Sequence, residues 1–236
     1  MLDGLPIVRD AFPRTVRLVS TARLRAAVLL ALVDQDDVAT LAEIEGATST
    51  RIRAQDRGLE HVHANEFVYG VPHSHFINAA FAYTRPRDLN RFNRDGRGAW
   101  YAALSLETCM REVVFHMQDF LRRAGEYQAT VEYAEMFASM AGEFLDLRNV
   151  QHPCLHPDVS IGYTAGNQIA DAALSKGLNG IIYPSARHPG GVCLAALRPH
   201  AVQSVATGDA YRMIWSGAPD PEIIKADPVD LVKETS

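Results

Sequence analysis

The sequence predicts an α+β protein in which helices flank a mixed or antiparallel sheet. Short apolar runs of strand length are interspersed with longer segments whose apolar residues recur every three or four positions. The order of these predicted strands and helices is typical of the α+β class. The 236 residues, 47% hydrophobic and 22% charged, indicate a globular chain that buries a core without disulfides and fits one large domain or two small ones.

Composition also limits the function classes. A formal net charge of −5 argues against a nucleic-acid binder that relies on a basic face. Three cysteines (Cys109, Cys154, Cys193) are too few, and odd in number, for a disulfide framework, which favours a reducing compartment. The longest apolar run, residues 26–33, is shorter than the roughly 20 residues that cross a bilayer, and residues 1–6 do not resemble a secretion signal. We therefore expect a cytoplasmic protein without a membrane anchor.

Two helices are predicted in the N-terminal third. Apolar spacing predicts one helix over residues 22–34 and a second around residues 41–44 that ends near Gly46. Residues 51–75 are mixed and polar and give no assignment. Residues 79–83, with the sequence AAFAY, predict a strand.

The best-defined segment follows a turn-rich stretch at residues 91–98. Residues 99–104 predict a short strand, and Ser105 is placed as the N-cap of a helix that runs to about Arg123, with Glu107 in its first turn. The predicted buried stripe of this helix consists of Leu106, Cys109, Met110, Val113, Met117, Phe120 and Leu121.

The C-terminal half predicts further strands around one helix. Residues 126–133 alternate between two sets of side chains, as in a half-exposed strand. Residues 164–176 predict a helix closed by Gly177. Two strands, 180–183 and 192–197, enclose the loop 184–191, and the chain after Ser216 is expected to wrap the surface.

Four candidate site residues follow from these placements. At about 100° per residue, Glu112 lies roughly 120° from the centre of the apolar stripe, where it either faces a cleft or is a solvated flank residue. Tyr101 follows Trp100 on a strand, so one ring faces the core and the other faces out; Tyr101 supplies either packing or a stacking face with a hydroxyl. Arg91 belongs to a turn with three arginines and two glycines, which is either a phosphate site or a solvated turn.

The fourth candidate, Ser185, lies in a loop with Arg187 and His188. The loop lacks the nucleophile-elbow pattern, so a hydrogen-bonding role or a plain turn is expected rather than nucleophilic attack. The pairs His61/His63 and His73/His75 could chelate a metal, but the spacings typical of zinc sites are missing, and we predict no metal. No pair of carboxylates stands out for glycosidase chemistry.

The order of these residues resembles the RES-domain family, named for its arginine, glutamate and serine. The resemblance spans roughly residues 15–200, and it is most specific at 91–116 and 180–194. Its successive positions are Arg17 in VRLV, Arg91 in RFN, Tyr101 in WYAA, Glu112 in REVVFH, and Ser185 in GIIYPSAR.

This resemblance implies a fold like that of ADP-ribosyltransferase toxins and a single catalytic domain over residues 1–236. The domain would carry a helical insertion at about 20–66 and a surface tail at about 217–236. Members of the family cleave the nicotinamide–ribose bond of NAD+, by phosphorolysis, hydrolysis or ADP-ribose transfer, and are typically toxins blocked by a helical Xre-type antitoxin. NAD+ is thus an expected substrate and inorganic phosphate a potential co-substrate, with no prosthetic group.

The resemblance also implies residue roles. Arg17 and Arg91 would hold the pyrophosphate or a phosphate, Tyr101 would pack near the nicotinamide ribose, and Ser185 would orient ribose or phosphate. Glu112 would bind ribose hydroxyls and stabilise positive charge as nicotinamide leaves. Because 73 residues separate Arg17 from Arg91, far more than in small members, Arg51 or Arg53 could replace Arg17.

Two other function classes stay open. The chain could transfer ADP-ribose to a protein target, or it could be a non-catalytic protein that binds a nucleotide or a partner on the same fold. The acceptor, the antitoxin and the oligomeric state, including a homo-oligomer, are also open.

Overall fold

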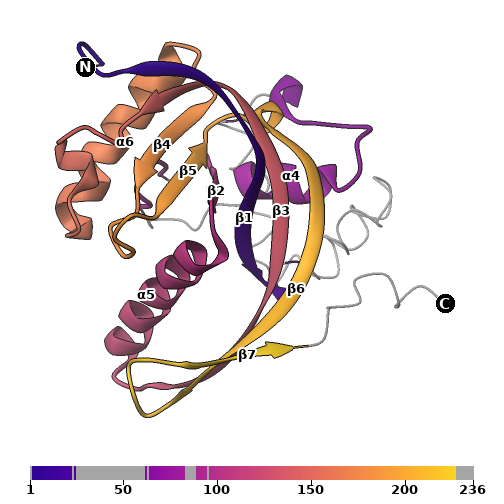
Figure 1. Cartoon of the computed structure of the whole chain (residues 1–236), viewed down its shortest axis with the longest axis vertical. Helices are drawn as coiled ribbons and strands as arrows, with labels where there is room; N and C mark the ends of the chain where they lie inside the picture. The colour runs from indigo at the N-terminus through magenta and orange to yellow at the C-terminus, as the bar shows by residue number, and fades with distance from the viewer. Residues whose placement is uncertain are drawn as a thin grey trace, which may run out of the picture.

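The computed structural model describes residues 2–22, 24, 62, 64–82, 89–94 and 96–226. A mixed seven-stranded sheet dominates this part of the chain, with α5 on the concave side of three long curved strands (Figure 1). The strands are β1 (Ile7–Ser20), β2 (Trp100–Ala103), β3 (Gln128–Asp146), β4 (Gly180–Pro184), β5 (Val192–Ala196), β6 (Val202–Ser216) and β7 (Glu222–Ala226). The helices are α4 (Ser74–Ala82), α5 (Leu106–Ala124) and α6 (Val159–Ser175), with short 3-10 turns η1 (Ala64–Glu66), η2 (Pro153–Leu155) and η3 (Pro199–Ala201).

The sheet closes on itself through its first strand. The strand order is β1-β2-β5-β4-β3-β6-β7, and β1 also pairs with β3, so five strands form a ring from which β6 and β7 extend. The β1–β3 pairing runs from Ile7 opposite Leu145 to Ser20 opposite Tyr133. Among these seven described strands, only β3 and β4 pair in parallel, and the other pairings are antiparallel. The predicted α+β class with a mixed sheet and flanking helices is therefore confirmed.

Two hydrophobic cores lie on the two faces of the short strands. Ile181 and Ile182, which are consecutive in β4, belong to different cores, as alternation along a strand requires. One core contains residues of α5 and α6, and the other contains residues of α4. Both faces of β2 are covered as well: Trp100 is buried in one core and Tyr101 packs on the other. The expectation that one of these two rings faces out is wrong, because the sheet is sandwiched at this point.

The prediction of a strand at residues 79–83 is wrong. Residues 79–82 form the last part of α4. The buried residues of this helix, Phe76, Ile77 and Phe81, follow helical spacing. A window restricted to AAFAY misses that spacing, because two of its three contributors lie before it.

Elsewhere the differences concern ends and lengths. The predicted strand at 126–133 is confirmed but continues to Asp146, and the predicted helix at 164–176 begins earlier, at Val159. Phe120, placed in the buried stripe of α5, is 54% exposed, so this part of the predicted stripe is wrong. Of the tail after Ser216, residues 217–220 are exposed and residues 222–226 form the edge strand β7 beside β6, while residues 227–236 lie outside the described residues.

The helices predicted at 22–34 and 41–44 lie almost wholly outside the described residues; residues 22 and 24 of the first are described, and both are helical. In the part of the chain that the structure describes, no helix is both long enough and apolar enough to span a bilayer.

Candidate active site

Glu112 is positioned by a helix with well-defined ends. The Ser105 side chain accepts a hydrogen bond from the backbone N–H of Thr108 at 3.2 Å, as the N-cap prediction requires. Gly125 ends the helix with a left-handed conformation (φ 78°) that favours glycine. These two caps fix the register of α5, and Glu112 lies partly buried on its flank, in contact with the next element of the site.

That element is the β4–β5 loop, which carries Ser185. The Ser185 hydroxyl donates to Glu112 Oε1 at 2.6 Å, a length typical of a charge-assisted O–H···O bond. The Ser185 Oγ atom also accepts hydrogen bonds from the backbone N–H groups of Arg187 (3.1 Å) and His188 (3.0 Å). Ser185 is therefore a hydrogen-bonding residue that holds one carboxylate oxygen of Glu112. The structure brings together two candidates that are 73 residues apart in sequence.

A second contact fastens this loop to the start of α5. His188 Nδ1 lies 2.8 Å from Thr108 Oγ1, which lies 2.8 Å from Ser105 Oγ. Thr108 is 1% exposed. A Cβ atom on Gly191 would come within 2.8 Å of both the Oγ1 and Cγ2 atoms of Thr108, so the loop approaches the helix as closely as glycine allows. The distance between Glu112 and Ser185 is thus set by packing on both sides.

Arg91 is buried beside this cluster, and its guanidinium group binds backbone carbonyl groups of the protein. Its Nη1 donates to the carbonyl oxygens of Cys154 at 2.6 Å and His156 at 3.1 Å. Its guanidinium carbon lies 5.5 Å from the centre of the Tyr163 ring. Arg91 therefore ties the turn at 91–98 to the segment that precedes α6.

Electrostatic effects place Arg91 and Glu112 in one neighbourhood. Burial raises the pKa of Tyr163, the Arg91 guanidinium opposes this shift, and the Glu112 carboxylate adds to it. Burial lowers the pKa of Arg187, which Glu112 raises and Arg91 lowers further. Both charges thus act on the same two side chains, one from α6 and one from the β4–β5 loop. Arg91, Glu112 and Ser185 converge on one region of the molecule.

Tyr101 stands in the wall of this region with its hydroxyl turned inward. The hydroxyl accepts the backbone N–H of Phe92 at 2.9 Å and donates to Asn93 Oδ1 at 2.9 Å. Burial raises the pKa of Tyr101 well above its ordinary value, so the hydroxyl stays protonated. Tyr101 thereby anchors the two residues that follow Arg91.

We expect Tyr101→Phe to lower the free energy of unfolding by about 1–3 kcal/mol, because it leaves the Phe92 N–H and the buried Asn93 side chain without this partner. Urea unfolding monitored by circular dichroism measures the change. Tyr69→Phe is the control, since Tyr69 is 70% exposed. Equal losses in both variants would contradict the anchoring role.

Arg17 lies on β1. Its guanidinium carbon is 4.7 Å from the centre of the Trp100 ring, and Nη1 lies 3.5 Å from the Tyr101 carbonyl oxygen. The structure thus brings Arg17 to the backbone of β2 and to Trp100. Arg51 and Arg53, the alternatives to Arg17, lie outside the described residues.

The cysteines are placed as packing residues. All three are free and buried. Cys193 Sγ is 4.0 Å from Glu112 Oε1, and burial raises the pKa of the Cys109 thiol to about 12 and that of Cys154 to about 11. Thiols that stay protonated are poor nucleophiles, so Cys109 and Cys154 are packing residues, while Cys193 also contacts the Glu112 carboxylate.

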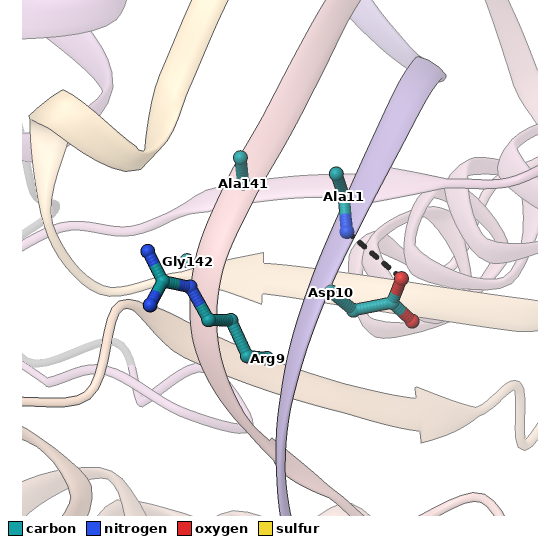
Figure 2. Close-up of a pocket in the computed structure, with 5 residues that line it drawn as sticks. All are labelled: Arg9, Asp10, Ala11, Ala141 and Gly142. Carbon is teal, nitrogen blue, oxygen red and sulfur yellow. Dashed lines mark hydrogen bonds between the residues drawn. The ribbon is translucent and has the colours of Figure 1, made fainter.

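Two hollows lie apart from the Glu112–Ser185 pair. One, on the β1–β3 pair, is lined by Arg9, Asp10, Ala11, Ala141 and Gly142 (Figure 2). The other, about 450 Å³, lies between the turn at 91–98 and α6, and Phe92, Asn93, Arg97 and Asn167 are among its lining residues. The second hollow adjoins the candidate site, because Asn93 also binds the Tyr101 hydroxyl.

Metal ligands are not clustered in the described residues: no group of three or more His, Cys, Asp or Glu side chains could hold an ion there. The rings of His73 and His75 lie 6.2 Å apart at the start of α4. His61 and His63 lie outside the described residues.

Sequence reasoning missed several members of the cluster. Arg187 and His188 were noted only as neighbours of Ser185, although their backbone N–H groups bind its hydroxyl. Tyr163 and Thr108 gave no signal, because a helical tyrosine and a threonine near a helix start are ordinary packing residues. Arg187, two residues after the candidate Ser185, is the clue to these additional residues that the sequence contains.

Comparison with known proteins agrees with the resemblance inferred from the sequence. The uncharacterized protein y4oC of Sinorhizobium fredii (strain NBRC 101917 / NGR234) is 27% identical over 213 residues, which cover 89% of this chain and 85% of that protein. The family model of the RES domain matches residues 67–216, more than half of the chain. The match contains Arg91, Tyr101, Glu112 and Ser185, and Arg17 lies before it. This protein belongs to the RES-domain family.

Proposed function

We propose that this protein is an NAD+-consuming enzyme that cleaves the bond between nicotinamide and ribose. The observation that carries the proposal is the 2.6 Å hydrogen bond from Ser185 to Glu112, which fixes a carboxylate beside two arginines in a chain of the RES-domain family. RES-domain proteins are generally associated with NAD+ processing, and the proposed site has a charge arrangement that suits this chemistry.

In the proposed reaction the C1′–N bond of the nicotinamide riboside unit breaks, and both bonding electrons leave with the nicotinamide nitrogen. Nicotinamide departs neutral, so no general acid is needed, while positive charge develops on the ribose. Glu112 stabilises that charge, and the Ser185 hydroxyl keeps the carboxylate in place. An oxygen of phosphate or water then bonds to C1′, and when water attacks, it loses a proton to solvent.

The shape of the sheet supports an ADP-ribosyltransferase-like fold. Long curved strands enclose α5 on their concave side, and the shorter strands β2, β4 and β5 complete the ring (Figure 1). Because β1 pairs with both β2 and β3, this strand belongs to the same sheet as the family match although it precedes residue 67, which supports one catalytic domain. The proposed domain includes the helical insertion at about 20–66, most of which lies outside the described residues. Its proposed partner is a helical Xre-type antitoxin.

Incubation of the purified protein with NAD+ tests the function directly. We expect nicotinamide release, together with ADP-ribose 1″-phosphate when phosphate is present or ADP-ribose when water is the acceptor. Chromatography and mass spectrometry of the products distinguish the two acceptors. ADP-ribose mass added to a protein would identify a transferase instead. Intact NAD+ under all of these conditions would contradict the proposed function.

A further inference from the structure

Arg187 is held rigidly beside the proposed site. Its guanidinium carbon lies 3.4 Å from the centre of the Phe115 ring, on the helix that carries Glu112. Its Nη2 donates to the carbonyl oxygen of Pro157 at 2.6 Å. An aromatic face and a backbone acceptor thus fix the plane of the guanidinium group, so little side-chain freedom is left to lose when a ligand binds.

One donor of this guanidinium lacks an acceptor. The Nε atom of Arg187 is buried and makes no hydrogen bond within the described part of the chain. Leaving a buried donor unpaired is costly, and it is more costly for a charged group. A ligand oxygen that reaches Nε would remove that cost.

The surroundings of Arg187 indicate the charge of the ligand. Arg91 donates to the carbonyl of His156 and Arg187 to the carbonyl of the next residue, Pro157, so the two guanidinium groups hold adjacent peptide units. Burial lowers the pKa of Arg187 and Arg91 lowers it further, while Glu112 and Tyr163 act in the opposite direction. Two neighbouring guanidinium groups favour an anion, and their planar forks suit phosphate oxygens.

Arg187 is also the better placed of the two for a ligand. Nη1 of Arg91 already serves two carbonyls, whereas Arg187 keeps an unpaired Nε. In addition, the backbone N–H of Arg187 binds the same hydroxyl that holds Glu112, so its main chain is part of the Ser185 turn.

We propose that Arg187 is a phosphate-binding residue of this site, with Nε donating to a phosphate oxygen of the ligand. The inference rests on the proposed function for its choice of ligand. A phosphate oxygen could come from the diphosphate of NAD+ or from free phosphate that acts as the acceptor. The chemistry of the contact is the same in both cases, and the two sources are separated by experiment.

Equilibrium binding without turnover tests this proposal independently of catalysis. Isothermal titration calorimetry of the full chain with ADP-ribose and, separately, with inorganic phosphate compares wild type with Arg187→Met. We expect Arg187→Met to lower the affinity for one of the two ligands at least tenfold. Loss of ADP-ribose affinity assigns Arg187 to the substrate diphosphate, and loss of phosphate affinity alone assigns it to the acceptor.

Arg198→Met is the matched control. Arg198 also has a buried, unpaired Nε and donates to a backbone carbonyl, that of Leu174, but it lies outside the Glu112 cluster. We expect the affinities of Arg198→Met for ADP-ribose and for phosphate to stay within twofold of those of wild type. Arg187→Lys, which keeps the charge and loses the fork, guards against a folding defect in the methionine variant, and we expect affinity between those of wild type and Arg187→Met.

Unchanged affinity for both ligands in a folded Arg187→Met protein would overturn the proposal, as would a wild-type protein that binds neither anion. Nicotinamide release measured on the same preparations reports on the proposed function separately. A protein that binds ADP-ribose through Arg187 without releasing nicotinamide would contradict the function and leave the phosphate contact standing.

Discussion

Replacing Glu112 by glutamine is expected to reduce nicotinamide release from NAD+ by about 10³-fold, the upper range for loss of one transition-state electrostatic contact. The amide has the same shape and can still accept the Ser185 hydrogen bond, but it lacks the negative charge that stabilises the ribose cation. The melting temperature should therefore stay close to that of wild type. Initial rates of nicotinamide release, measured by chromatography, give the effect.

Glu126→Gln is the control for this substitution. Glu126 is an exposed glutamate just beyond the end of the same helix, so its loss changes the net charge equally without touching the site. Its rate should equal that of wild type. Glu112→Gln turnover at the wild-type rate would show that another group stabilises the transition state.

The second large effect is expected from Gly166→Ala. A Cβ atom on Gly166 would lie 1.9 Å from the carbonyl oxygen of Arg91, so α6 rests directly on the backbone of the turn at 91–98. Backbone cannot yield as a flexible side chain does, and overpacking of this kind costs typically 1–3 kcal/mol and occasionally more. Because the displaced residue is Arg91, we expect nicotinamide release to fall together with stability.

Urea unfolding measures the loss of stability in Gly166→Ala. Gln168→Ala is the matched substitution: Gln168 is exposed on the same helix, and alanine there should keep or slightly raise the free energy of unfolding because of its helix propensity. A Gly166→Ala protein as stable as this control would mean that α6 does not rest on the turn as described.

The sequence predicts the elements best where local chemistry decides them. The Ser105 cap and the alternation at the start of β3 both follow from side chains within a few residues. The long strand β1 and the second half of β3 gave no such signal. Each is stabilised by the other across more than a hundred residues of chain.

The candidate site follows the same rule. Glu112 and Ser185 can be picked out from the sequence because their residue types occur in the order that resembles the family. The structure joins them by one hydrogen bond. The engagement of Arg91 with two carbonyls and the unpaired Nε of Arg187 could not be predicted, because both depend on where the segment at 154–157 lies. That segment is placed by tertiary packing of α6 and has no local signature.

The pairing of β1 has a consequence for biosynthesis. On the ribosome, residues 7–20 emerge before β2 and β3 and have no partner until β2 and then residues 133–145 of β3 have been made. Contacts of such high sequence separation form slowly and late. Ser185 is translated later still, so the nascent chain cannot hold the Glu112 carboxylate in position. Under the proposed function, cleavage of NAD+ therefore begins only after the chain has been synthesised beyond Ser185.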